Sequence, residues 1–260
     1  MNKTINVIKI GGNVIDDPVA LNAFLTDFAA IERPKVLVHG GGREATRLSA
    51  RLGIQNKMID GRRVTDDETL EVVTMIYAGL LNKRIVAALQ ARGCKAVGLS
   101  GADGDLIPAT RRPAEPIDYG NVGDIDANLV SDRFLEVLFS AGYTPVVCAI
   151  CHDRHGNLLN CNADSVAAAL AVGASRLGRV RLTYCFEQPG VMTDLTDEAS
   201  LVPLVTPAIF DELRSSGKVS GGMLPKLSNA LQCAADGVGE VRICRAADLC
   251  GLGGTIVRQA

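Results

Sequence analysis

The sequence predicts an α/β fold, a three-layer αβα sandwich built around a mainly parallel sheet. Two observations predict it. Apolar segments typical of strands alternate along the chain with patterns typical of helices, and several strands are followed by pairs or triplets of glycine. Such alternation is typical of parallel sheets with helices on both faces. A length of 260 residues, with 47% hydrophobic and 22% charged residues, fits a globular chain with a full core.

In the first part of the chain, the elements have clear start signals. Asp17 is suited to cap a helix that has Pro18 at its first position. Thr65 and Glu68 are the ends of a capping-box pattern that opens a long helix. The predicted elements are a strand over residues 4–10, a helix burying Leu21, Phe24, Leu25 and Phe28, a strand over residues 35–39, a polar helix up to Arg51, and a long helix with Leu70, Val73, Tyr77 and Leu80 on one side.

The second part continues the alternation. Its predicted strands cover residues 95–99, 144–150, 179–185 and 240–244, and its predicted helices cover residues 164–172, 207–215 and 223–235. A soft boundary falls near residues 142–144 of what we interpret as one domain over residues 1–260. In open parallel sheets, ligands bind beyond the carboxyl ends of the strands, so the site is expected there.

Charge and composition exclude several kinds of partner. The 27 Lys and Arg against 29 Asp and Glu give a net charge of −2, and aromatic residues make up 4% with no Trp. Such a chain lacks the basic field and the stacking surfaces typical of nucleic-acid binding, and the basic field typical of membrane-surface binding. The N-terminus has no export signal pattern, and the apolar run over residues 166–174 is shorter than the roughly 20 residues of a membrane span. We therefore expect a cytoplasmic protein.

Two interpretations exist for a cluster of cysteines and histidines. Cys148, Cys151 and His152 have the spacing of covalent haem attachment, and His155 and Cys161 lie near enough to suggest zinc. The same residues continue a strand pattern in which cysteine acts as a small buried hydrophobe. The second interpretation is favoured, because haem attachment requires export and a second Cys/His pair is missing. No metal site in the protein itself is expected.

Glycine-rich turns are the most informative feature. Gly11-Gly12, Gly40-Gly41-Gly42 and Gly221-Gly222 each separate a strand or loop from a helix pattern. Unpaired N–H groups and the helix dipole make such turns suited to phosphate or carboxylate. Neither the P-loop nor the dinucleotide-binding glycine pattern is present. Lys9 and Lys226 lie close to two of these turns in the sequence, which suggests phosphoryl chemistry.

Five segments carry a resemblance to a known family. Together they resemble the amino acid kinase family, and more narrowly its acetylglutamate-phosphorylating branch, over nearly the whole chain. The lysine before the first glycine pair marks the wider family, whereas the R-V-T and N-x-N-A-D segments are narrower signals. The segments are V-I-K-I-G-G-N at residues 7–13, V-H-G-G-G at 38–42, G-R-R-V-T at 61–65, N-C-N-A-D at 160–164 and G-G-M-L-P-K at 221–226.

The resemblance implies an activity. ATP, with Mg²⁺ carried by its phosphates, would phosphorylate the side-chain carboxylate of N-acetyl-L-glutamate, a step of arginine biosynthesis. Lys9 and Lys226 would be catalytic, stabilising the transferring phosphoryl group from opposite sides, and Asp164 would hold both lysines in place. The half over about residues 1–143 would bind substrate and form a homodimer, and the half over about 144–260 would bind nucleotide.

The resemblance also implies contacts for both substrates. Gly41 and Gly42 would receive the reacting carboxylate, and Arg63 would grip the α-carboxylate with Asn160, since a guanidinium binds a carboxylate bidentately. Arg62 fits a surface salt bridge instead. The nucleotide-binding residues would be Gly12, Glu187, Gly221 and Gly222. Glu187 stands where the family usually has Asp, in a turn that follows a strand.

Some alternatives stay open. The substrate could be another N-acylglutamate such as N-succinylglutamate, or the chain could be a catalytically silent amino-acid sensor on the same fold. The chain starts at its first strand, without the extra N-terminal helix of the arginine-inhibited hexamers of the family. We therefore expect a homodimer that arginine does not inhibit.

Overall fold

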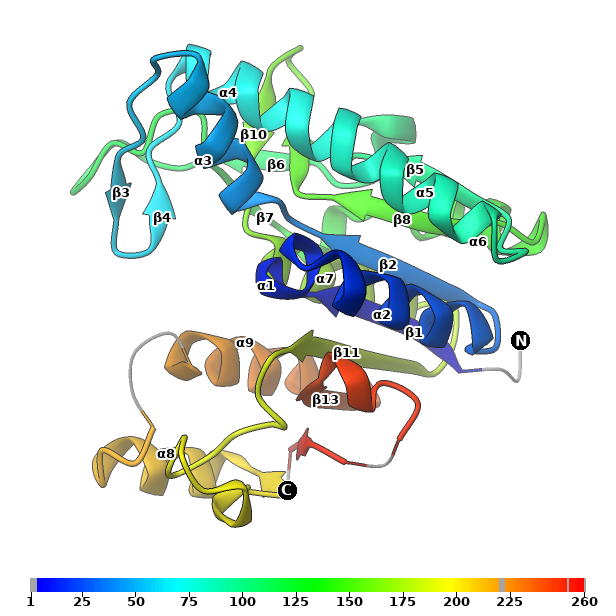
Figure 1. The fold of residues 1–260 in the computed structure, drawn as a ribbon, viewed down its shortest axis with the longest axis vertical. Helices are drawn as coiled ribbons and strands as arrows, with labels where there is room; N and C mark the ends of the chain where they lie inside the picture. The colour runs from blue at the N-terminus through cyan, green and yellow to red at the C-terminus, as the bar shows by residue number, and fades with distance from the viewer. Residues whose placement is uncertain (1–3, 220–222, 252, 260) are drawn as a thin grey trace.

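The structure, a computed structural model, describes residues 4–219, 223–251 and 253–259 (Figure 1). The predicted glycine pair Gly221-Gly222 lies outside the described residues. The helices are α1 Gly12–Asp16, α2 Pro18–Ala30, α3 Gly42–Arg51, α4 Asp67–Thr74, the π-helix η1 Met75–Leu81, α5 Asn82–Gln90, α6 Asp132–Ser140, α7 Ala163–Ser175, α8 Pro207–Ser215 and α9 Met223–Ala235, with short 3₁₀ turns η2 Asp103–Asp105, η3 Ala127–Leu129, η4 Glu198–Ser200 and η5 Ala246–Asp248.

Eight strands form the central sheet, in the order β12-β14-β13-β11-β1-β2-β8-β5. Its strands are β1 Ile5–Ile10, β2 Lys35–His39, β5 Ala96–Leu99, β8 Thr144–Cys148, β11 Val180–Phe186, β12 Leu204–Val205, β13 Glu240–Arg245 and β14 Thr255–Val257. All pairs are parallel except β13 with β14. Strand β1 lies inside the sheet, with β11 on one side and β2 on the other.

The remaining strands form three antiparallel pairs outside the central sheet. These pairs join β3 Met58–Ile59 with β4 Arg62–Arg63, β6 Ala109–Arg111 with β7 Gly123–Ile125, and β9 Ile150–His152 with β10 Leu158–Asn160. The β3–β4 hairpin turns at Asp60 and Gly61, both with positive φ, as two-residue hairpin turns require. In Figure 1 it extends away from the body of the protein, next to α3.

Helices cover both faces of the sheet, which confirms the predicted three-layer sandwich. Helices α2 and α5 contact each other, and α5 packs on β5 and β8. On the other face, α6 contacts α7 and α7 contacts α9, while α7 packs on β1, β2 and β11. Figure 1 shows α2 in front of β1 and β2 and α7 behind them. The core is built from buried aliphatic side chains of these strands together with Phe24, Leu25 and Phe28 of α2, as predicted.

The start of the long helix differs from its prediction. Asp66, not Thr65, is the N-cap, because its carboxylate accepts the N–H of Thr69. Thr65 instead is buried, and its hydroxyl donates to the Arg63 carbonyl. The capping-box interpretation of Thr65 and Glu68 was therefore wrong by one residue.

The apolar face of the same helix also differs. Leu80 was predicted to be buried and is 39% exposed, whereas Leu81 is buried. The cause is η1, since a π-helical turn adds a residue and rotates the following face. Within the described residues, the continuous helix Asp67–Gln90 is long and apolar enough by composition to cross a membrane, with a mean hydropathy of 1.4 in its best window. Its apolar side packs into the domain core, and core helices of soluble proteins pass the same test.

Candidate functional site

The site lies at the carboxyl ends of β1, β2 and β11, where Lys9 and Asp164 meet. Lys9 is the next-to-last residue of β1 and is 9% exposed. Its Nζ lies 2.7 Å from Asp164 Oδ1. Asp164 stands in the first turn of α7, which begins there because the Asn162 side chain accepts the N–H groups of Asp164 and Ser165. The structure thus brings together two residues that the sequence predicted as partners.

Lys226 joins this pair from α9. Burial lowers the pKa of its ammonium, the Asp164 carboxylate raises that pKa, the Lys9 ammonium lowers it and the Glu187 carboxylate raises it. Its Nζ also lies 4.3 Å from the centre of the Phe186 ring, a cation–π contact. The Lys226 ammonium therefore feels the charges of the Lys9–Asp164 ion pair and of the Glu187 carboxylate.

Gly12 and Glu187 flank this group of charges. Gly12 is the first residue of α1 and is separated from the end of β1 by Gly11 alone, and the space where its side chain would point is open. Glu187 directly follows β11 and acts on Lys226, as above. The predicted nucleotide contacts of Gly12 and Glu187 stay predictions, as do those of Gly221 and Gly222.

The second glycine turn forms the wall of a cavity. Gly41 is the N-cap of α3, and Gly42 is its first residue. The first N–H groups of a helix have no partner inside it, so they are available to an anion. A Cβ at Gly41 would lie 2.4 Å from Leu81 Cδ1 and 2.9 Å from Tyr77 Cδ1, so close packing against η1 requires glycine here.

The cavity has a volume of about 240 Å³. Its lining combines backbone, cations and small apolar groups: Gly40, Gly41, Gly42, Met58, Gly61, Arg62, Arg63, Tyr77, Val122, Ala149, Asn160, Cys161, Asn162 and Ala163. All four predicted substrate-binding residues are in this set. The geometry can hold a small ligand that carries more than one carboxylate.

Arg63 and Asn160 are fixed in this cavity by hydrogen bonds. Arg63 is 8% exposed, and its Nη2 donates to the Gly42 carbonyl at 2.9 Å and to Thr46 Oγ1 at 2.8 Å. Its Nη1 donates to Asn56 Oδ1. Asn160 Nδ2 donates to Thr65 Oγ1 at 3.0 Å. Arg63 therefore links the β3–β4 hairpin to the start of α3, a link that the sequence pattern did not indicate.

Arg62 and Tyr77 are cavity residues that the sequence reasoning missed. Arg62 was interpreted as a surface salt bridge, but no ion pair of Arg62 occurs among the described residues, and it lines the cavity. Tyr77 was assigned only to the core. Burial raises the pKa of its phenol, which Arg63 opposes by its charge and by hydrogen bonding. The adjacency of Arg62 to Arg63 was the only signal for Arg62 in the sequence.

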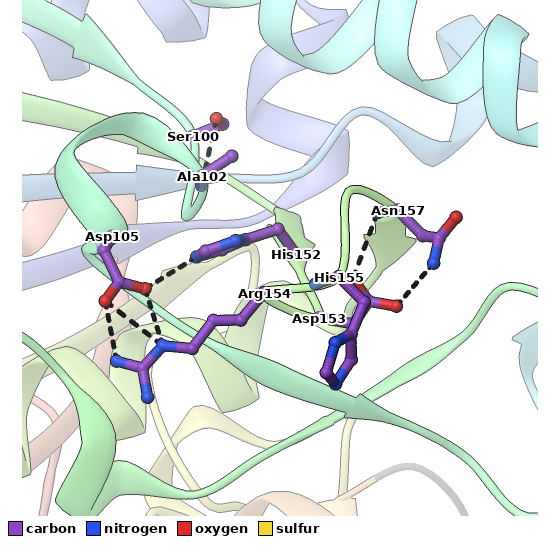
Figure 2. Close-up of polar contacts among 8 residues, drawn as sticks. All are labelled: Ser100, Ala102, Asp105, His152, Asp153, Arg154, His155 and Asn157. Atoms are coloured by element: carbon purple, nitrogen blue, oxygen red, sulfur yellow. Dashed lines mark hydrogen bonds and ion pairs between the residues drawn. The ribbon is translucent and has the colours of Figure 1, made fainter.

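The cysteine cluster belongs to the core, as the sequence favoured. Cys148 and Cys151 are 0% exposed, and burial raises the pKa of Cys148 to about 12. Figure 2 shows His152 directed at Asp105, with Nε2 3.0 Å from Oδ1, while the His155 ring points away. Arg154 binds the same carboxylate of Asp105. In the described parts of the chain, no group of three or more His, Cys, Asp or Glu side chains could hold a metal ion.

A larger cavity, of about 710 Å³, lies at the opposite, amino-terminal edge of the sheet. It is lined by several cations, including Lys35 and Arg92. These cations already have partners. Lys35 Nζ donates to three carbonyls at the end of α2, and Arg92 Nη1 donates to the Ala88 carbonyl of α5. They act as helix C-caps, so cavity size alone does not select this edge.

The fold and the charges of this site are those of an α/β enzyme that binds carboxylate or phosphate groups. Residues 4–245 match the amino acid kinase family, and the chain belongs to this family of phosphotransferases. A protein of Phocaeicola vulgatus named acetylglutamate kinase is 46% identical over 259 residues, covering 100% of both chains. A protein of the same name from Methanopyrus kandleri is 42% identical over 97% of this chain and 99% of its own.

Solved structures share the fold. The structure of smu.665 from Streptococcus mutans superposes with a TM-score of 0.78 at 25% identity, covering 98% of each chain. The resemblance stated for the five sequence segments is therefore confirmed at the level of the family, over the full chain.

Proposed function

We propose that the chain transfers the γ-phosphoryl group of ATP to the side-chain carboxylate of N-acetyl-L-glutamate, in arginine biosynthesis. The relatives named acetylglutamate kinase support this substrate over the whole length of the chain. The observation that carries the proposal is the placement of the Lys9–Asp164 ion pair at the same sheet edge as a cavity lined by Arg63, Gly41 and Gly42.

The proposed reaction follows from the positions of the charges. The N–H groups of Gly41 and Gly42 receive the reacting carboxylate, and one of its oxygens attacks the γ-phosphorus. The bond from that phosphorus to the bridging oxygen of ADP breaks, giving an acyl phosphate and ADP. Lys9 and Lys226 stabilise the negative charge that spreads over the phosphoryl oxygens, which is the main requirement of this chemistry. Asp164 keeps Lys9 oriented without leaving a buried charge unpaired.

The remaining contacts complete the proposal. Arg63 and Asn160 hold the α-carboxylate, and Gly12, Glu187, Gly221 and Gly222 contact the nucleotide. Mg²⁺ would arrive on the nucleotide phosphates and supply charge neutralisation there. We propose a cytoplasmic homodimer, with the N-terminal half binding N-acetylglutamate and forming the dimer and the C-terminal half binding ATP.

An acyl-phosphate assay tests the function. The purified protein with MgATP and N-acetylglutamate should give a product that hydroxylamine traps as a hydroxamate. Lys226→Ala should remain folded and lose kcat by several orders of magnitude, since the lysine acts on the transition state. A chain that binds N-acetylglutamate but forms no hydroxamate would instead be a silent sensor.

One observation, the position of Arg62, favours N-succinylglutamate as a second candidate substrate. Arg62 lines the cavity with no ion pair among the described residues, and a succinyl group would bring an additional carboxylate that needs a cation. Running the assay with N-acetyl- and N-succinylglutamate side by side separates the two substrates. If succinyl is the true group, Arg62→Gln should lower kcat/KM for N-succinylglutamate by about 10-fold or more and leave N-acetylglutamate almost unchanged.

A further inference from the structure

His39 is a buried polar residue that the proposed reaction does not yet use. It is the last residue of β2, directly before the Gly40–Gly42 turn, and it is 0% exposed. Its ring has two polar contacts. Nδ1 lies 2.8 Å from the Gly40 carbonyl oxygen, and Nε2 lies 3.1 Å from Nδ2 of Asn82, which is also fully buried.

These contacts permit only one protonation state of the ring. Asn82 Nδ2 also donates to the Val146 carbonyl at 2.9 Å, and a carbonyl can only accept. The amide therefore presents its NH₂ group to His39, so Nε2 must be the acceptor. The proton of the neutral ring is then on Nδ1, which donates it to the Gly40 carbonyl. Burial lowers the pKa of His39 to about 4, in agreement with a permanently neutral ring.

Asn82 is held in place from the other side. Lys83 Nζ donates to Asn82 Oδ1 at 3.1 Å and to the Gly98 carbonyl at 3.2 Å. A Cβ at Gly98 would lie only 1.9 Å from Asn82 Oδ1, so the glycine in β5 leaves the room that the Asn82 amide fills. With two donor contacts and one acceptor contact, the buried amide is well satisfied.

The same stretch of helix contacts the turn twice. Asn82 directly follows the π-helix η1, whose Tyr77 and Leu81 pack against Gly41. π-Helical turns occur often at functional sites. Here the extra residue of the turn lets Leu81 pack on Gly41 while Asn82 reaches His39.

We propose that His39 and Asn82 are positioning residues for phosphoryl transfer. The Gly40 carbonyl and the Gly41 N–H belong to one trans peptide group and point in opposite directions. By holding the carbonyl, the neutral His39 ring directs the Gly41 N–H toward the cavity, where it receives the reacting carboxylate. Without this bond, the peptide can rotate and the N–H is lost to the substrate. The inference rests on the proposed function, because it assigns a role within that reaction.

Kinetics of His39→Phe and Asn82→Leu test the proposal. Asn82→Leu keeps the number of side-chain heavy atoms, His39→Phe keeps a planar aromatic ring, and both remove the hydrogen bonds. We expect kcat/KM for N-acetylglutamate to fall by about 10- to 100-fold, the size expected when a reacting group is misplaced by a fraction of an ångström. KM for ATP should stay within about 2-fold. Because the two residues act as a unit, the double variant should lose no more than the worse single variant.

Ile85→Ala is the matched control. Ile85 lies in α5, one turn beyond Asn82, and is 1% exposed. The control should lose at least as much stability as the test variants while keeping kcat/KM. Test variants that keep kcat/KM for N-acetylglutamate, or that raise KM for both substrates equally, overturn the proposal.

An NMR measurement that needs no turnover tests this inference independently of the proposed function. In the wild-type protein, the ¹⁵N resonances of the His39 ring should show a protonated Nδ1 and an unprotonated Nε2 from pH 8 down to about pH 5. The Gly41 amide resonance should shift in His39→Phe. A ring protonated on Nε2 would overturn the proposal whatever the substrate is, whereas a missing hydroxamate product would count only against the proposed function.

Discussion

The ammonium of Lys9 lies 2.7 Å from the Asp164 carboxylate, and both side chains are almost entirely shielded from water, at 11% and 14% exposure. An ion pair in such a place is costly to desolvate, and removing one partner leaves a charge uncompensated. The ion pair therefore contributes more to the orientation of the Lys9 ammonium than to the stability of the fold. It fixes a cation at the end of β1, where the proposed phosphoryl transfer requires one.

Replacing Asp164 with Asn should show whether Asp164 is needed to orient Lys9 for turnover rather than for folding. The amide keeps the shape but no longer attracts Lys9, so we expect kcat to fall by about 100- to 1000-fold, as when a group that stabilises developing charge is lost. Steady-state turnover measures the fall. Asp105→Asn is the control, because it removes the carboxylate that pairs with Arg154 outside the site. A kcat for Asp164→Asn as high as that of this control would rule out the role of Asp164.

The alkaline side of the pH–rate profile should report Lys226. Burial lowers its pKa below the usual 10.5, and the Glu187 carboxylate partly opposes this. In the proposed reaction the ammonium is the active form, so kcat should fall as the pH rises through the lowered pKa. Glu187→Gln removes the opposing charge, so the fall should move to lower pH. Lys226→Arg should abolish the fall, since arginine stays charged. A Glu187→Gln profile superposed on that of the wild type would show that Glu187 does not act on Lys226.

Stability should depend on pH through His39. Its folded-state pKa of about 4 is below the ordinary 6.5, so the unfolded chain binds a proton between these values and the native state does not. The contribution of the neutral His39 ring to the free energy of unfolding is complete above pH 6.5, and it is lost as the pH falls from 6.5 toward 4. The loss is at most about 3.5 kcal/mol, since one pKa unit corresponds to about 1.4 kcal/mol. Urea unfolding at several pH values measures it, and His39→Phe should lose this part of the slope.

Two glycine-to-alanine substitutions should differ in their effects. At Gly41, the new methyl would lie 2.4 Å from Leu81 Cδ1, so we expect destabilisation of about 1–3 kcal/mol and a weaker affinity for N-acetylglutamate. At Gly12, the space is open within 4 Å, so the free energy of unfolding should hardly change. The methyl at Gly12 should instead raise KM for ATP. Denaturant unfolding and the two KM values check the pair, and equal destabilisation by both would contradict it.

Much of the fold could be predicted because its signals are local. Asp17 with Pro18 starts α2 as predicted, and strand β2 has the predicted bounds. The errors occur where tertiary contacts override the local pattern. Leu80 is exposed because the π-helix rotates the helix face, and no residue pattern announces a π-helical turn. The apolar run over residues 144–150 is divided at Ala149, whose carbonyl accepts from Cys161 rather than continuing the strand.

The site shows the same division. Lys9, Gly41 and Asp164 could be found because short motifs surround them. Arg62 and Asn82 could not, since their importance depends on which distant segment they face. Asn82 matters through His39 and Val146, and three separate segments must be folded before the amide meets both.

The position of β1 between β2 and β11 has a consequence for how the chain acquires its activity. During synthesis, β2 follows β1 closely, but β11 ends only at Phe186. Until then, the strand that carries Lys9 is an edge strand with unpaired backbone groups, and closing this long connection is entropically slow. Lys9, the proposed catalytic lysine, is therefore enclosed only by a late, long-range folding step, and a truncated chain that ends before β11 should be prone to aggregate rather than to be partly active.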